Sequence, residues 1–252
     1  MITIKSRSEI EKMRNAGRIT GLALVEISKH IRPGVSTKEL DKVAYDFIKR
    51  HGATPSFLNY NGYPASICAS VNDMVVHGIP AKDIVLKEGD IISIDIGAYK
   101  DGYHGDAART YAVGEISDEA KRLIAVTKQS FFEGIKHAIH GAKLGDISSA
   151  IQNYVEENGY SVVRDLVGHG IGKELHEDPS VPNFGRQGKG VKLAKGMTLA
   201  IEPMVNMGEY DVAVLDDDWT VVTEDGSLSA HYENTVLITD GKPEILTMFD
   251  EV

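Results

Sequence analysis

The stretch that decides the fold is Gly89-Asp-Ile-Ile-Ser-Ile-Asp95, an apolar run that ends on a carboxylate. It recurs in register 107 residues later, between positions 196 and 202, as Gly196-Met-Thr-Leu-Ala-Ile-Glu202. The helical segment that ends Phe47-Ile-Lys-Arg-His-Gly52 recurs at the same offset as Tyr154-Val-Glu-Glu-Asn-Gly159. Two matches at one offset indicate a duplicated unit. An unpaired carboxylate at the end of a buried strand is costly, so we expect a cation between the halves.

Composition narrows the class of protein. The chain has 252 residues, which suits one domain built from two similar halves, about 1–114 and 115–252. Acidic residues outnumber basic ones by 37 to 27, which argues against a nucleic-acid partner. The single cysteine, Cys68, excludes an intramolecular disulfide and a cysteine-based zinc knuckle. The N-terminus lacks a secretion signal and no run is long enough to span a membrane, so we expect a soluble, cytoplasmic protein with no membrane partner.

Helix signals occur as two pairs, one in each half. Ser8 with Glu11 and Ser36 with Glu39 have the pattern of capping boxes, each followed by apolar residues at helical spacing. Pro33-Gly34 ends the first predicted helix. In the second half a helix is predicted from 118 to 139, and Asp146 is expected to cap the next one.

Short strands are predicted between these helix pairs, and Asp101-Gly102 marks the turn of a hairpin from Ile91 to Val113. Residues 53–70 and 182–190 are predicted loops, being rich in Pro, Asn and Gly. We expect an α+β fold: an antiparallel sheet with a pseudo-two-fold axis and helices packed on one face. The predicted strands are 91–96, 107–113, 161–165, 198–202, 219–223 and 232–239.

Four carboxylates and one histidine are the candidates for chemistry. Asp95 and Asp106 lie on the two arms of the predicted hairpin, and Glu202 is the repeat partner of Asp95. Glu233 interrupts an apolar strand, and His169 lies in Gly168-His-Gly-Ile-Gly172, where the glycines leave room for the ring to approach a ligand. This oxygen-rich set suits a pair of divalent transition ions better than a structural zinc. Two such ions would orient one water between them.

Each of these residues taken singly has an ordinary structural explanation. An aspartate near a turn is usually a turn former, and Asp101 is best interpreted in that way. A histidine in a glycine-rich loop is more often structural than a ligand, and Glu233 alone could be a solvated edge residue. The equivalence of Asp95 and Glu202 in the repeat favours the joint interpretation, because it is independent of any assumption about chemistry.

The five residues, in this order and spacing, resemble the metal ligands of the type I methionine aminopeptidases, within the pita-bread superfamily of prolidase and creatinase. The neighbouring segments Val71–Pro80, Asp95–Gly97, Gly102–Asp106, Gly168–Gly172 and Ile201–Pro203 match as well, and the resemblance covers essentially the whole chain. It implies the pita-bread fold and the metal-dependent removal of an initiator methionine from nascent proteins whose second residue is small. The nucleophile would be a metal-activated hydroxide that attacks the peptide carbonyl.

The same resemblance assigns roles to the metal-binding and catalytic residues. Asp106 and Glu233 would bridge two ions (Co, Mn, Fe or Zn), His169 and Glu202 would complete one site, and Asp95 the other. Glu202 would also be the general base. His176 would stabilise the oxyanion and His77 would hold the peptide nitrogen.

The methionine side chain would lie among aromatic and sulfur-containing neighbours, which suit a thioether. Three positions depart from the family pattern: Phe57 stands where a smaller residue is common, Leu175 where Phe is usual, and His231 where Gln is usual. The resemblance implies N-terminal Met peptides and nascent chains as partners, a monomer, and leaves a transient ribosome contact open. The predicted pocket residues are Phe57, Tyr60, Tyr63, Cys68, Leu175 and Trp219, with His77 and His176 at the scissile amide.

Two other functions remain open at this point. A pita-bread relative that cleaves Xaa-Pro dipeptides usually carries a separate N-terminal domain, for which this chain has no room. A catalytically silent binding protein would tend to lose metal ligands, whereas all five are present here.

Overall fold

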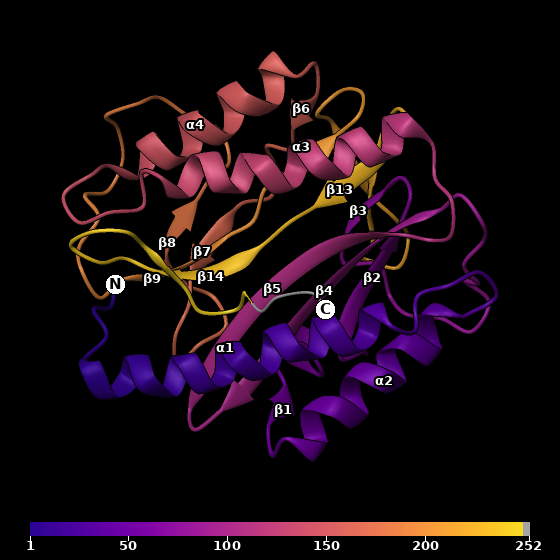
Figure 1. Ribbon diagram of the computed structural model, residues 1–252, viewed down its shortest axis with the longest axis horizontal. Helices are drawn as coiled ribbons and strands as arrows, with labels where there is room; N and C mark the ends of the chain where they lie inside the picture. The colour runs from indigo at the N-terminus through magenta and orange to yellow at the C-terminus, as the bar shows by residue number, and fades with distance from the viewer. Residues whose placement is uncertain (249–252) are drawn as a thin grey trace.

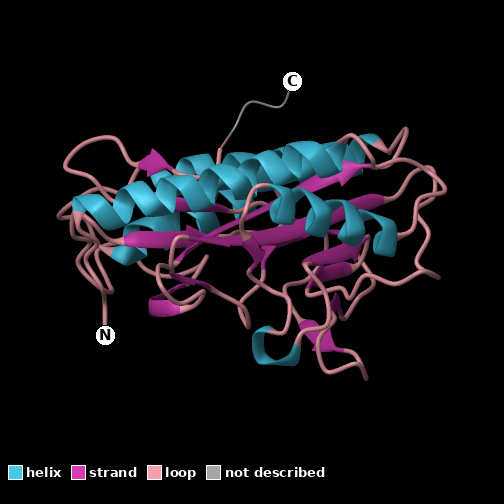
Figure 2. Cartoon of the chain, turned by 90° about the horizontal axis from the view of Figure 1, so that it is seen from below, coloured by secondary structure: helices cyan, strands magenta, loops and turns pink. Residues whose placement is uncertain are grey.

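A computed structural model describes residues 1–248; residues 249–252, the last four of the predicted domain, lie outside the described part. Its four α-helices lie together on one side of the strands, as Figures 1 and 2 show and as the sequence predicts. The helices are α1 (Arg7–Ser28), α2 (Thr37–Arg50), α3 (Asp118–Ile135), α4 (Leu144–Glu157) and the 3-10 turn η1 (Tyr60–Gly62).

Capping side chains set where the first two helices begin. Glu39 accepts a hydrogen bond from the Ser36 amide at 2.9 Å, so the predicted capping box of α2 is confirmed. The box predicted at Ser8 and Glu11 is wrong, because α1 begins two residues earlier. There the Ser6 amide donates to Glu9 at 2.8 Å, and Glu9 also accepts from the Tyr103 hydroxyl at 2.7 Å.

The second helix pair repeats the first. Helix α4 runs from 144 to 157 and α2 from 37 to 50, so both bounds are shifted by 107 residues. Asp146 does not occupy the cap position that was predicted for it; it lies three residues inside and accepts from the Lys143 amide at 2.8 Å. Helix α3 ends at Ile135, four residues before the predicted end. This correspondence supports the prediction of two similar halves.

The described strands form four antiparallel sheets, and one of these, β11-β12-β3, joins strands from both halves. In the first half β4 pairs with β5, with β2 and with β1; in the second the strand order is β15-β14-β9-β7-β8. The strands are β1 (Thr54–Pro55), β2 (Ile67–Val71), β3 (Met74–Val76), β4 (Ile91–Lys100), β5 (Tyr103–Ala112), β6 (Ser161–Val162), β7 (Gly168–Gly170), β8 (Glu177–Val181), β9 (Thr198–Ile201), β10 (Met204–Asn206), β11 (Val212–Val214), β12 (Val221–Thr223), β13 (Ser229–His231), β14 (Asn234–Leu237) and β15 (Glu244–Ile245).

The predicted hairpin is confirmed, and its two strands are longer than the predicted runs 91–96 and 107–113. Strands β4 and β5 pair from Ile91 with Ala112 to Lys100 with Tyr103. Asp101 and Gly102 both have positive φ, 53° and 87°, as a two-residue hairpin turn requires.

The two halves meet where β5 lies beside the start of β14, which Figure 1 shows near the centre of the molecule. Ala108 and Glu233 exchange backbone hydrogen bonds of 3.3 and 2.9 Å, and the Asp106 amide donates to the Thr235 hydroxyl at 3.0 Å. Carboxylates from both halves are therefore fixed to one seam by main-chain contacts.

The predicted loop 53–70 is partly wrong. Residues 67–71 form strand β2, which pairs with β4 and is almost entirely buried. Several predicted strands are shorter than expected: 161–165 reduces to β6, 219–223 to β12, and 232–239 to β14. The loop at 182–190 is confirmed. None of the described helices is both long and apolar enough to cross a membrane.

Candidate metal centre and substrate pocket

A cavity of about 260 Å³ opens beside the seam between the halves. Every predicted metal-binding, catalytic and pocket residue lines it, together with one residue that was not predicted, Asn61. The lining residues are Phe57, Tyr60, Asn61, Tyr63, Cys68, His77, Asp95, Asp106, His169, Leu175, His176, Glu202, Trp219 and Glu233.

Strand register explains why the acidic residues converge. In the hairpin, Gly97 lies opposite Asp106, and Ala108 lies opposite Asp95. The two aspartates are therefore offset by two residues and share one face of the sheet. In the second half Asn234 pairs with Ile201, which places Glu202 and Glu233 beside each other at the end of the β9–β14 ladder.

Burial among like charges dominates the electrostatics of the four acids. Burial raises the pKa of Asp95 to about 7. Burial, and then the charges of Asp95 and Glu202, raise the pKa of Asp106 well above its usual value. The pKa values of Glu202 and Glu233 are raised in the same way. Among the described residues no lysine or arginine forms an ion pair with any of them. The charge of Arg109 lowers the pKa of Glu233, but by less than burial raises it, so the four acids still lack the paired cation that buried carboxylates need.

His169 presents its second ring nitrogen to these acids. Strand β7 places His169 opposite Ala200, so its side chain shares a face with Glu202. Nδ1 lies 2.8 Å from the carbonyl oxygen of Gly170, which can only accept, so Nδ1 carries the proton. Burial lowers the pKa of His169 to about 3, so the ring is neutral. The lone pair of Nε2 then faces Glu202 Oε1 at 3.5 Å and Asp106 Oδ2 at 3.8 Å.

These residues fit divalent cations. A lone pair that faces carboxylate oxygens is unfavourable unless a proton or a metal cation lies between them. Asp95 Oδ1, Asp106 Oδ1 and Glu233 Oε1 are buried without a hydrogen-bond partner. Ligand atoms of Asp106, His169 and Glu233 lie within 4.8 Å of one another, and those of Glu202, His231 and Glu233 do so too. Carboxylates with one oriented imidazole suit divalent transition ions.

Two further histidines line the cavity on the side away from the acids' seam. His176 Nδ1 lies 2.7 Å from the Tyr60 hydroxyl, and its ring centroid is 4.2 Å from that of His169. His77 has a positive φ of 60°, uncommon outside glycine, and its ring faces Trp219 edge-on at 6.3 Å. Burial lowers the pKa of both histidines, so both are neutral at pH 7.

Part of the cavity wall is apolar. Tyr63 points its hydroxyl at the carbonyl oxygens of Ile67 and Gly78, 3.0 Å from each, and its ring packs edge-on against Trp219 at 5.0 Å. Cys68 lies opposite Asp95 in the β2–β4 ladder, and burial raises the pKa of its thiol. Phe57 and Leu175 complete this wall, in one buried cluster with Tyr63 and Cys68.

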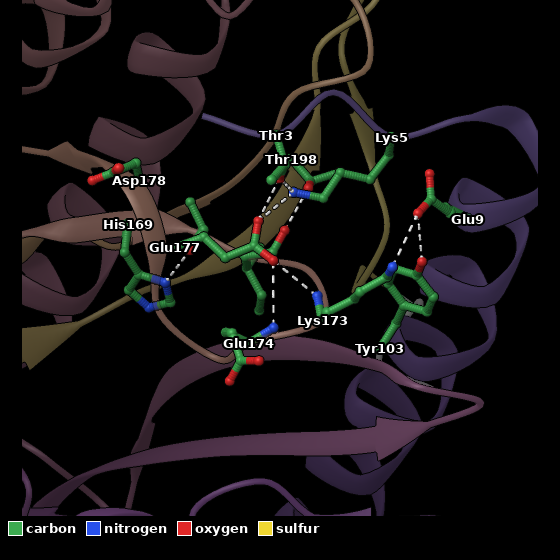
Figure 3. A network of polar contacts seen from close by, with 12 residues as sticks. Thr3, Lys5, Glu9, Tyr103, His169, Lys173, Glu174, Glu177, Asp178 and Thr198 are labelled. Atoms are coloured by element: carbon green, nitrogen blue, oxygen red, sulfur yellow. Dashed lines mark hydrogen bonds and ion pairs between the residues drawn. The ribbon is translucent and has the colours of Figure 1, made fainter. Parts of the chain in front are cut away.

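The segment that carries Leu175 and His176 is held by a buried carboxylate, shown in Figure 3. Glu177 Oε1 accepts from the amides of Lys173 and Glu174 at 2.9 and 3.3 Å. Its Oε2 accepts from Lys5 Nζ and from the Thr3 hydroxyl, both at 2.6 Å. Burial alone would raise the pKa of Glu177, but these hydrogen bonds and the Lys5 charge lower it.

The glycines around His169 have a different role from the one expected. A Cβ at Gly168 would lie 2.4 Å from the Ala200 carbonyl oxygen, and one at Gly170 would lie 2.1 Å from that of Asp178. They let the neighbouring strands approach closely and do not make room for a ligand.

Sequence reasoning missed several supporting residues. Asn183 donates to the Glu202 carbonyl oxygen at 3.0 Å, and Asp217 accepts from the amides of Trp219 and Thr220 at 2.9 and 2.7 Å. Asn61 has a φ of 50° within η1. The Asn-Gly pair at 61–62 was the one available signal for a left-handed turn here.

The chain is similar in sequence and in fold to known proteins. The profile of Metallopeptidase family M24 matches residues 11–240. A methionine aminopeptidase of Clostridium acetobutylicum is 62% identical over 248 residues, 98% of this chain and 99% of that protein. The crystal structure of a methionine aminopeptidase from Thermotoga maritima has a TM-score of 0.97 at 50% identity, covering 99% of this chain and all of that one. Prolidase from Pyrococcus furiosus, with a TM-score of 0.79 and 24% identity over 98% of this chain and 66% of its own, shares the fold.

The chain therefore belongs to metallopeptidase family M24, whose pita-bread fold it has. Its extensive identity to the bacterial proteins places it, within that family, among the methionine aminopeptidases.

Proposed function

We propose that this chain removes the N-terminal methionine from peptides and nascent chains whose second residue is small. The observation that carries the proposal is the convergence on one cavity of four carboxylates, none of them in an ion pair with a lysine or arginine among the described residues, and of the Nε2 lone pair of His169. Two divalent cations, of Co, Mn, Fe or Zn, would be held by Asp95, Asp106, His169, Glu202 and Glu233. Asp106 and Glu233 would bridge them.

When bound, such cations lower the pKa of a water molecule toward neutrality and polarise a carbonyl oxygen. Glu202 is the proposed general base, since its carboxylate lies at the cavity wall and its buried environment favours accepting a proton. Asp95, in the opposite half, would complete the second cation site beside the substrate amine.

His176 is the proposed donor to the oxyanion. The half-buried Tyr60 hydroxyl keeps its proton, because partial burial raises its pKa, and can donate to Nδ1 of His176. The neutral ring then carries its proton on Nε2, which can donate to the developing negative charge. His77, held in a strained backbone conformation, would orient the peptide nitrogen.

The methionine side chain would lie in the cavity against the wall formed by Tyr60, Tyr63, Cys68, Trp219, Phe57 and Leu175. Aromatic edges and a buried sulfur provide polarizable neighbours for a thioether. The rigid packing of Tyr63 against Trp219 favours one side-chain shape over others.

The test is hydrolysis of Met-Ala-Ser and Met-Ile-Ser by chelator-treated protein to which one metal at a time is restored. Release of methionine from Met-Ala-Ser alone, dependent on added metal, supports the proposal. Equal cleavage of both peptides would contradict the selectivity, and cleavage of neither with any metal would contradict the function. Cleavage of an Xaa-Pro dipeptide instead would indicate the prolidase activity.

A further inference from the structure

A buried histidine that none of the proposed roles uses lies behind Glu202. His231 ends strand β13 and is 1% exposed. Its amide donates to the Thr110 hydroxyl at 2.8 Å, and that hydroxyl donates to the His231 carbonyl oxygen at 3.0 Å. Pairing with Met204 fixes the other side of its backbone. The position of the ring is therefore set by two neighbouring strands.

The ring itself lacks partners. Neither Nδ1 nor Nε2 of His231 has a hydrogen bond within residues 1–248. Nε2 lies 3.7 Å from Glu202 Oε2, while the other oxygen of Glu202, Oε1, faces His169 at 3.5 Å. An imidazole ring carries at least one N–H in either protonation state, so His231 has a hydrogen to donate. Native proteins rarely leave such a buried group unsatisfied without a reason.

His169 shows what a metal-binding histidine needs in this fold. A ligating imidazole usually passes its second N–H to an acceptor, as His169 does to the Gly170 carbonyl oxygen. Nδ1 of His231 has no such acceptor, and His231 is absent from the residues that line the cavity. These observations favour a donor to Glu202 over a further metal ligand.

We propose that His231 is a positioning residue that donates its Nε2–H to Oε2 of Glu202 and so turns Oε1 toward His169 and the cation site. Closing the gap to a hydrogen bond of about 2.9 Å needs a movement of less than about 1 Å. The inference rests on the proposed function, in which Glu202 is both ligand and base. Groups that orient a metal ligand typically change metal affinity or activity by about 10- to 100-fold when removed.

Three variants distinguish a hydrogen-bond donor at position 231 from a side chain that only fills space. In His231→Gln the amide nitrogen reaches the place of Nε2; in His231→Asn it reaches only that of Nδ1; His231→Met has similar length and no donor. The quantities to measure are the Mn²⁺ affinity, by calorimetry on metal-free protein, and kcat and KM for Met-Ala-Ser at saturating Mn²⁺. Met and Asn should lose about 10- to 100-fold in Mn²⁺ affinity or kcat, whereas Gln should stay within about fivefold of the wild type.

Thermal unfolding of the metal-free proteins is the control. Replacing an unsatisfied polar ring by an apolar side chain should leave His231→Met at least as stable as the wild type. If that variant does not fold, the comparison of Gln with Asn decides, since both are amides.

Wild-type behaviour of His231→Met, or of His231→Asn if Met does not fold, would overturn the inference. A Mn²⁺-bound crystal structure with Nε2 of His231 on the ion would do so too. Failure of the wild type to cleave Met-Ala-Ser would instead count against the proposed function, and the Mn²⁺ affinities would still test His231.

Discussion

At the scale of single residues, the site is a group of ionisable side chains whose pKa values are shifted in opposite directions. The pKa values of the carboxyl groups are raised, that of Asp95 to about 7. The pKa values of the buried histidines His169 and His231 are lowered to about 3. Burial is the largest cause in each case. Without metal, the folded protein therefore favours neutral acids and neutral imidazoles.

This pattern predicts how the stability of the metal-free protein depends on pH. A carboxyl group whose pKa is raised on folding contributes stability at pH values below its pKa in the unfolded state. That contribution is lost as pH rises through its pKa in the folded state. A lowered histidine pKa contributes stability above the unfolded value of about 6.5, which is lost as pH falls. Above pH 6.5 only the contribution of the carboxyl groups to the free energy of unfolding still changes with pH. We expect the free energy of unfolding to fall between pH 6.5 and 8, by about 1.4 kcal/mol per pH unit for each proton that the folded state still holds and the unfolded state has lost.

Thermal melts of chelator-treated protein at several pH values check this expectation. Added divalent metal should remove or reverse the trend, because it binds deprotonated carboxylates. Asp95→Asn is the matched variant and should flatten the profile. A melting temperature of the metal-free wild type that rises steadily from pH 6.5 to 8 would show that the acids are not buried together.

His176 offers a second residue-scale prediction. His176→Ala should keep its metal, because the proposed ligands are untouched, and lose about a hundredfold in kcat through the missing oxyanion donor. Metal content by atomic emission and kcat for Met-Ala-Ser measure the two effects separately. Near-normal turnover with full metal content would remove His176 from the chemistry.

At the scale of elements, short segments aim these side chains. The segment from 172 to 177 is tied to the N-terminus through the Lys5–Glu177 pair, whose side chains are 5% and 10% exposed. Lys5 is held in turn by its amide, which donates to the Gly196 carbonyl oxygen at 2.8 Å. The N-terminal residues thus brace the loop that carries His176.

Removing the cation from this pair should loosen that loop. Lys5→Met leaves a buried carboxylate without its charged partner, and we expect a loss of about 3 kcal/mol in the free energy of unfolding. Because His176 would be held less well, kcat should also fall. Lys195→Met is the control, since Lys195 pairs with Asp240 at the surface, where both side chains are more than half exposed. Equal small effects in both variants, by denaturant unfolding and peptide assay, would refute the bracing role.

The elements also show where sequence reasoning succeeded and failed. Helix α2 was located from Ser36 and Glu39 because its cap and apolar face agree. The start of helix α1 was predicted two residues too late, because Ser6 and Ser8 each precede a glutamate by three residues. Which serine caps the helix depends on the distant Tyr103 hydroxyl, which donates to Glu9. Strand β2 was missed because its turn-rich neighbours hide a run buried on both faces, which has no alternation.

At the scale of the whole molecule, the site brings together segments that lie far apart in the sequence. Asp95 and Glu202 were predicted from the offset of 107 residues between two matching segments, which the sequence displays directly. Asp106 was predicted from the hairpin and Glu233 from its place in an apolar strand. His231 was noted only as a departure from a pattern. Its relation to Glu202 depends on the pairing of β13 with β10, and Asn183 likewise reaches Glu202 across a loop. Contacts set by long-range register leave no local signal in a single sequence.

The central claim is that acids from both halves hold a pair of divalent cations, and anomalous scattering from crystals soaked in Mn²⁺ tests it most directly. The account predicts two peaks about 3.5–4 Å apart, one beside Asp95 and one beside His169 and Glu202, with Asp106 and Glu233 between them. Soaked crystals with no peak among these five residues, or with peaks only elsewhere, would contradict it.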